Sequence, residues 1–153
     1  MNGEPTRQAE GKGMYKEARF SEMRVGDSAF VRRTFTEADI ANFAGVTGDF
    51  NPLHIDEEYA RATRFKGRIA HGYLTASLIT NVTGNQLPGP GGIYISQDFR
   101  FVGPVRSGDT ITATVEIIEK IEGKRQVRLK TSCYNQDGKA VLEGEGLLKI
   151  MNE

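Results

Sequence analysis

The sequence predicts an α+β fold in which one central helix packs against an antiparallel sheet of about five strands. Residues 69–97 contain no Asp, Glu, Lys or Arg, although 26% of the chain is charged. A charge-free helix in such a chain is normally covered by other elements on most sides. Beyond residue 92, apolar and polar residues alternate in several segments, as in strands with one buried face.

The first third of the chain is expected to hold one strand, two helices and a tight loop between the helices. Residues 28–35 are expected to form the strand. Thr36 is followed by an acidic residue three positions on, which is typical of a helix start, and apolar residues then recur at helical spacing as far as Gly48. Residues 49–53 favour an irregular loop, and Asp56 can cap a short second helix.

The rest of the chain predicts the central helix and the strands around it. The helix is expected over residues 72–87, with its apolar residues at helical spacing. Turns are expected at residues 122–124 and 137–138, where they would join antiparallel hairpins. The strands are expected over residues 93–101, 111–117, 127–133 and 140–150.

Length and composition limit what the protein can be. The 153 residues suit a single domain, expected over residues 21–153 behind a flexible tail at residues 1–20. Basic and acidic residues number 20 each, which argues against nucleic acid or an anionic membrane as a partner. The start of the chain lacks an apolar run, so a cytoplasmic location is expected. Cys133 lies in a strand-like segment and is interpreted as a buried, inert thiol.

The two histidines of the chain, His54 and His71, flank the start of the central helix, and Asp49 lies five residues before His54. Histidine exchanges protons near neutral pH, and a nearby carboxylate can share a water molecule with it. The alternative is an ordinary turn between helices, with His54 at the surface or capping a helix. The spacing matches no common metal-ligand pattern, so no metal is expected.

Gly72 follows His71 at the expected start of the central helix. Backbone N–H groups in the first turn of a helix are unpaired and can stabilise a carbonyl oxygen that gains negative charge. The alternative for Gly72 is close packing of the helix start against the sheet.

At these residues the chain resembles a known family. Residues 43–60 resemble the hydratase 2 signature of MaoC-like, R-specific enoyl-CoA hydratases, similar to those that supply polyhydroxyalkanoate synthesis. The resemblance continues in order through residues 69–74, 86–89 and 99–101, and it covers nearly everything from residue 35 to residue 150. The core of the signature reads Gly48-Asp49-Phe50-Asn51-Pro52-Leu53-His54.

The resemblance implies a hot-dog fold, a homodimer, and an enoyl-CoA substrate whose acyl chain lies in a tunnel at the subunit interface. It implies that Asp49 and His54 hold the attacking water, and that the Gly72 N–H receives the thioester carbonyl. It implies no cofactor, since coenzyme A belongs to the substrate. The residues implied to bind substrate are Asn51, His71 and Thr80, and a basic cluster near the tunnel mouth is a candidate for the coenzyme A phosphates: Arg61, Arg64, Lys66 and Arg68.

Other functions stay open on the sequence alone. The same chemistry in reverse would dehydrate 3-hydroxyacyl groups on acyl carrier protein, an acidic partner that a basic rim also suits. Thioester hydrolysis and non-catalytic acyl-CoA binding are further alternatives, and the presence of both Asp49 and His54 argues against them. The basic cluster has its own alternative as a solvated charged surface.

Overall fold

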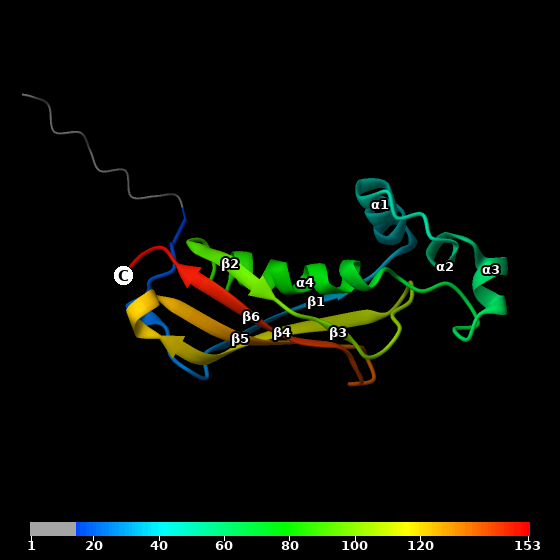
Figure 1. Ribbon diagram of the computed structural model, residues 1–153. Helices are drawn as coiled ribbons and strands as arrows, with labels where there is room; N and C mark the ends of the chain where they lie inside the picture. Colours follow the sequence, from blue (N-terminus) through cyan, green and yellow to red (C-terminus); the bar gives the residue numbers. More distant parts are fainter. Residues whose placement is uncertain (1–14) are drawn as a thin grey trace, which may run out of the picture.

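The computed structural model describes residues 15–153, and its centre is one antiparallel sheet with a helix along one face (Figure 1). The helix, α4, spans Gly72–Asn85. The sheet has the order β1-β4-β5-β6-β2, and β3 also pairs with β6. The α+β prediction is thus confirmed. The strands are β1 (Ser28–Thr34), β2 (Gly92–Gln97), β3 (Arg100–Phe101), β4 (Thr110–Ile121), β5 (Gln126–Tyr134) and β6 (Ala140–Ile150).

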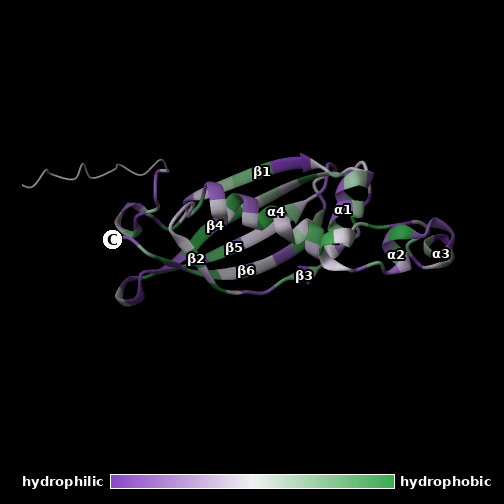
Figure 2. Cartoon of the chain, turned by 90° about the horizontal axis from the view of Figure 1, so that it is seen from above, coloured by the Kyte–Doolittle hydropathy of each residue, from purple (hydrophilic) through white to green (hydrophobic). Residues whose placement is uncertain are grey.

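Three short α-helices precede α4 in the described part of the chain, and two of them project beyond the end of the sheet (Figures 1 and 2). The first, α1 (Glu37–Thr47), begins with the expected capping box, in which Thr36 and Asp39 bond reciprocally. It ends at Gly48, whose φ of 75° is the left-handed conformation that glycine adopts without strain. The projecting pair is α2 (Pro52–Ile55) and α3 (Glu57–Ala62); single 3-10 turns occur at Phe20–Glu22 and Glu122–Lys124.

The core lies between α4 and the sheet. Figure 2 shows α4 lengthwise over the strands. Its Leu78, Ile79 and Val82 are buried, and they belong to one apolar cluster with inward residues of β4, β5 and β6. Burying each such aliphatic side chain contributes about 1.5–3 kcal/mol. This burial explains the absence of charges noted in the sequence.

The strand expected over residues 93–101 is interrupted at Asp98 and forms two strands, so the sheet has six rather than five. The Asp98 N–H donates to the Glu145 carbonyl at 3.0 Å. This approach needs a glycine on β6, since a Cβ at Gly144 would lie 2.0 Å from the Asp98 oxygen. Ile93 and Ile95 of β2 remain 53% and 50% exposed, so the edge of the sheet carries an apolar surface.

The described residues before β1 are hydrogen-bonded to residues next to β2 and β6. Residues 1–14 of the predicted tail lie outside the described residues. The Ala18 N–H donates to Pro90 O at 2.6 Å, and the Phe20 N–H donates to Asn152 O at 3.1 Å. The Phe20 side chain is buried in the core cluster. No helix in residues 15–153 combines the length and apolarity needed to cross a membrane.

Candidate active site

Asp49 lies on the loop between α1 and α2, and hydrogen bonds at two of its groups fix it there. Its N–H donates to Thr47 Oγ1 at 3.2 Å, and its Oδ1 accepts the Asn51 N–H at 3.2 Å. Asn51 Oδ1 in turn accepts the Leu53 N–H at 3.0 Å and caps α2. The Asp49 side chain is 50% exposed, and its Oδ2 lies 4.0 Å from His71 Nε2. The carboxylate is therefore both oriented and open to a small molecule.

His54 is partly buried on α2, and its ring is held by a backbone carbonyl. Its Nδ1 lies 2.8 Å from Ile69 O. A carbonyl only accepts, so Nδ1 carries the proton and Nε2 keeps a free lone pair. His54 is therefore placed to take a proton at Nε2.

His71 lies beneath these two residues and is only 2% exposed. Its Nε2 lies 2.9 Å from Asp49 O, and its ring centroid lies 3.9 Å from that of His54. One polar side-chain atom each of Asp49, His54 and His71 lies within 4.8 Å of the other two. Such spacing suits one water shared by a carboxylate and an imidazole. It would also suit a metal ion, so the expectation of no metal stays a prediction.

The start of α4 opens into a pocket of about 400 Å³ beside His54. His71 is the N-cap residue, and no side chain caps the helix. Backbone N–H groups at such a helix start lack an intrahelical partner, and Gly72 and Tyr73 of this first turn line the pocket. The geometry agrees with the alternative interpretation of Gly72, close packing of the helix start against the sheet, because the ring of Phe101 packs against its Cα. The glycine thus serves close packing and leaves the helix start open.

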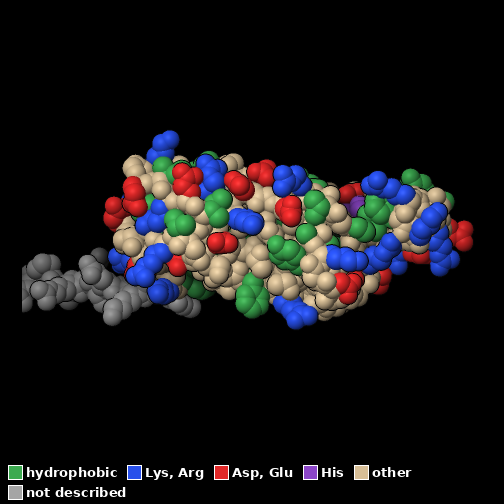
Figure 3. Space-filling view, turned by 90° about the horizontal axis from the view of Figure 1, so that it is seen from below, with side chains coloured by type: hydrophobic (Ala, Val, Ile, Leu, Met, Phe, Trp, Pro, Cys, Tyr) green, Lys and Arg blue, Asp and Glu red, His purple; other side chains and the backbone are tan. Residues whose placement is uncertain are grey.

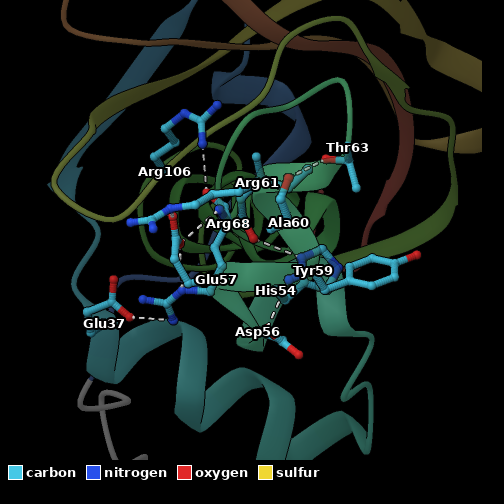
Figure 4. Close-up of polar contacts among 11 residues, drawn as sticks. Glu37, His54, Asp56, Glu57, Tyr59, Ala60, Arg61, Thr63, Arg68 and Arg106 are labelled. Carbon is cyan, nitrogen blue, oxygen red and sulfur yellow. Dashed lines mark hydrogen bonds and ion pairs between the residues drawn. The ribbon is translucent and has the colours of Figure 1, made fainter.

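The four basic residues of the predicted phosphate cluster differ in their surroundings. Figure 3 shows Lys and Arg side chains gathered on the projecting end of the molecule. Arg68 forms ion pairs with Glu37 at 3.0 Å and Glu57 at 3.3 Å, and Arg61 pairs with Glu57 at 3.1 Å (Figure 4). Arg64 is exposed and lines the pocket, and Lys66, two residues on, is exposed as well.

Thr80 lies apart from the group formed by Asp49, His54 and His71. It lies more than two turns along α4 from Gly72, on the exposed side of the helix. Its hydroxyl donates to Ser77 O at 2.7 Å. Within a single chain it therefore does not meet the pocket that holds His54.

Arg106 is a supporting residue that the sequence analysis missed. Its guanidinium donates to Arg68 O at 2.9 Å (Figure 4) and also to Phe65 O. These bonds hold the segment next to Ile69, whose carbonyl accepts the hydrogen bond of His54. Glu57 anchors the same segment: the Arg68 N–H, then the Arg68 and Arg61 guanidinium groups, hold its pKa below the ordinary value. No local pattern signals contacts to carbonyls about forty residues away.

The fold and the site together define a class of protein: a sheet packed along one helix, with a carboxylate and an imidazole beside the open start of that helix. Comparison with known proteins gives the family. The chain belongs to the MaoC-like domain family, which matches residues 24–138.

Two curated relatives and one solved structure show how close the similarity is. An (R)-specific enoyl-CoA hydratase of Rhodospirillum rubrum is 46% identical over 86% of this chain and 90% of that protein. A 3-hydroxybutyryl-CoA dehydratase of Methylorubrum extorquens is 44% identical over 86% and 83%. The unliganded R-hydratase PhaJ1 of Pseudomonas aeruginosa superposes with a TM-score of 0.83 at 42% identity, covering 90% of this chain and 88% of its own. The predicted hot-dog fold is confirmed.

Proposed function

We propose that this protein is an (R)-specific enoyl-CoA hydratase, which adds water reversibly across the double bond of a trans-2-enoyl-CoA. One observation carries the proposal: one polar side-chain atom of Asp49 lies within 4.8 Å of one of His54, and His54 lines the same pocket as the uncapped start of α4. The similarity to an enoyl-CoA hydratase and to a 3-hydroxybutyryl-CoA dehydratase supports a coenzyme A thioester as the substrate.

The reaction needs a base, a proton donor and a place for negative charge. A water held between Asp49 and His54 loses a proton to this pair, and its oxygen forms a bond with C3 of the substrate. The electron pair of the double bond moves toward the thioester carbonyl, whose oxygen accepts the Gly72 N–H. Asp49 and His54 then return a proton to C2, which gives (R)-3-hydroxyacyl-CoA. The two groups share the work as a coupled pair.

The other substrate-binding assignments are part of the same proposal. Asn51 shapes the loop that carries Asp49, and Arg64 and Lys66 are the members of the basic cluster best placed for the coenzyme A phosphates. Arg61 and Arg68 are already neutralised by Glu57 and Glu37, so their contribution to phosphate binding is smaller.

A homodimer is proposed as the working form. The edge strand β2 exposes the apolar side chains of Ile93 and Ile95, which would be covered if a second copy met this edge. Exposed Thr80 on α4 would then lie near the partner rather than in solvent.

Acyl-CoA thioesters are intracellular metabolites, so a cytoplasmic enzyme of fatty-acid or polyhydroxyalkanoate metabolism accords with this substrate.

The test follows the loss of crotonyl-CoA absorbance with purified protein and determines the configuration of the 3-hydroxy product. Rapid loss that yields the R isomer is expected. Asp49→Ala and His54→Ala should each lower kcat at least about a hundredfold in protein that melting curves show to be folded. Release of free thiol would replace this proposal with a thioesterase. Turnover only of thioesters on acyl carrier protein would replace the substrate class, and retained hydration in a folded double variant would reject the site.

A further inference from the structure

We infer that His71 is a positioning residue of this site: its Nε2–H holds the backbone of Asp49, and through Asp49 it fixes where the shared water binds. The inference rests on the proposed hydratase function. It gives His71 a role distinct from the substrate contact expected from the resemblance.

The hydrogen bond defines a single tautomer of His71. Its Nε2 lies 2.9 Å from the Asp49 carbonyl oxygen, which only accepts, so Nε2 carries the proton. The other ring nitrogen, Nδ1, is buried and has no hydrogen-bond partner among the described residues. The imidazole therefore acts here as a donor from one nitrogen.

Packing alone would not favour histidine at this position. The ring is almost fully buried between the rings of Phe43, at 5.0 Å, and His54, at 3.9 Å. An unpaired polar nitrogen in such a place is destabilising, and an apolar ring of similar size would avoid this cost. The bond to Asp49 O is the interaction that an apolar ring would lose.

His71 also occupies the point where the parts of the site meet. It is the N-cap residue of α4, yet its side chain does not cap the helix and reaches back 22 residues to Asp49. Its carbonyl accepts the N–H groups of Leu74 and Thr75 at 3.1 and 3.3 Å, and Gly72 follows it directly. One residue therefore sets the position of Asp49 relative to the N–H that would receive the thioester oxygen. Small displacements between such groups have large effects on rate.

Two variants distinguish the contribution of the Nε2–H donor of His71 from that of its ring. His71→Phe keeps a ring against His54 and removes the donor, whereas His71→Gln keeps an N–H donor near the position of Nε2 and removes the ring. We expect kcat for crotonyl-CoA to fall about tenfold to a hundredfold in H71F with little change in KM, because the pocket that binds substrate is intact. H71Q should retain kcat within about fivefold of the wild type.

Melting temperatures show whether a loss of kcat comes from unfolding or from a displaced Asp49. Wild-type kcat in folded H71F overturns the inference, and so does a loss in folded H71Q as large as that in H71F. A change confined to KM would make His71 a substrate contact instead.

A spectroscopic measurement tests the inference on the wild type, independently of activity and of whether H71F folds. In protein labelled with ¹⁵N-histidine, the His71 signals should report a protonated Nε2 and an unprotonated Nδ1 at the assay pH, with assignment by the H71Q variant. A protonated Nδ1 with a bare Nε2 would overturn the inference. This measurement needs no substrate, so the two proposals can fail separately. A wild type that hydrates no enoyl-CoA would reject the proposed function. The tautomer of His71 would still show whether its Nε2–H holds the Asp49 loop.

Discussion

The ring of Phe101 lies against the Cα of Gly72, so that a Cβ built on Gly72 would be 2.8 Å from Cε1 of the ring and 2.9 Å from Cδ1. Real side chains do not approach so closely. Phe101 belongs to β3 and Gly72 begins α4, and the Tyr73 ring lies 5.6 Å from that of Phe101. The start of the helix is therefore closed on one side by an aromatic ring and open to the pocket on the other.

Gly72→Ala is expected to lower both activity and stability, because the added methyl must displace the Phe101 ring at the pocket. Overpacking of this kind costs about 1–3 kcal/mol. The double variant with Phe101→Ala should be less destabilised than the sum of the two single changes, as a denaturant-based double-mutant cycle would measure. Gly45→Ala is the matched control: it lies in α1 with nothing within 4 Å of its Cβ position, and should gain about 0.5–1 kcal/mol. Additive single changes would contradict this account of Gly72.

Asn51→Ala should weaken the loop that carries Asp49. The Asn51 side chain caps α2, and its own N–H orients the Asp49 carboxylate. Loss of the cap should cost about 1 kcal/mol, and a misplaced carboxylate should lower kcat about tenfold. Asn51→Asp keeps an acceptor at the cap and should recover most of the stability. An equal loss of stability in both variants, measured by urea unfolding, would argue against the cap.

Local patterns in the sequence predicted much of this fold because the forces involved act over a few residues. The Thr36 and Asp39 capping box, the charge-free α4 and the alternating strands are all of this kind. The break at Asp98 was not predicted, since it depends on Gly144 of another strand. The exposed Ile93 and Ile95 alternate like core residues, because an apolar strand face has the same sequence pattern whether it is buried within the chain or exposed at the edge of the sheet.

The candidate site was predictable only as a set of residue types. Asp49 and His54 are near neighbours in sequence, and a tight loop brings them together. The bonds that orient them come from farther away: His71 reaches Asp49 across 22 residues, and Ile69 holds His54 across 15. No spacing rule predicts these carbonyl contacts, which depend on where α4 starts relative to the loop.

Arg106→Lys should impair the site from a distance. The planar guanidinium donates to the carbonyls of Arg68 and Phe65 together, and an ammonium group cannot reproduce this fork. Each lost charge-assisted bond should cost about 1.5–3 kcal/mol, and the loosened segment carries the acceptor of His54. Arg100→Lys is the control, because its ion pair with Glu143 is exposed and should be worth less than about 1 kcal/mol. Equal melting temperatures for the two variants would reject this role.

Cys133 should not react with thiol reagents in the native protein. Burial raises the pKa of its thiol from 9.0 to about 12, so the thiolate is scarce at neutral pH. Because the folded protein binds the thiol proton more tightly than the unfolded chain does, this group stabilises the folded state fully below about pH 9, and the contribution is lost as the pH rises toward 12. Ellman's reagent should therefore modify the thiol only in denaturant. Rapid modification of the folded protein would contradict the burial.

Arg64→Ala is expected to raise KM for crotonyl-CoA about threefold to tenfold and to leave kcat unchanged, because Arg64 lines the pocket mouth where the coenzyme A phosphates are proposed to bind. The crotonyl thioester of N-acetylcysteamine lacks those phosphates and should be hydrated equally by variant and wild type. Arg61→Ala should change KM less, since Arg61 is already paired with Glu57. Added salt should raise KM for the coenzyme A substrate in the wild type and narrow the difference from the variant, because mobile ions screen exposed charges. If Arg64→Ala raised KM equally for both thioesters, the arginine would act on the acyl portion or on the shape of the pocket, and the phosphate site would have to be sought elsewhere on the basic end of the molecule.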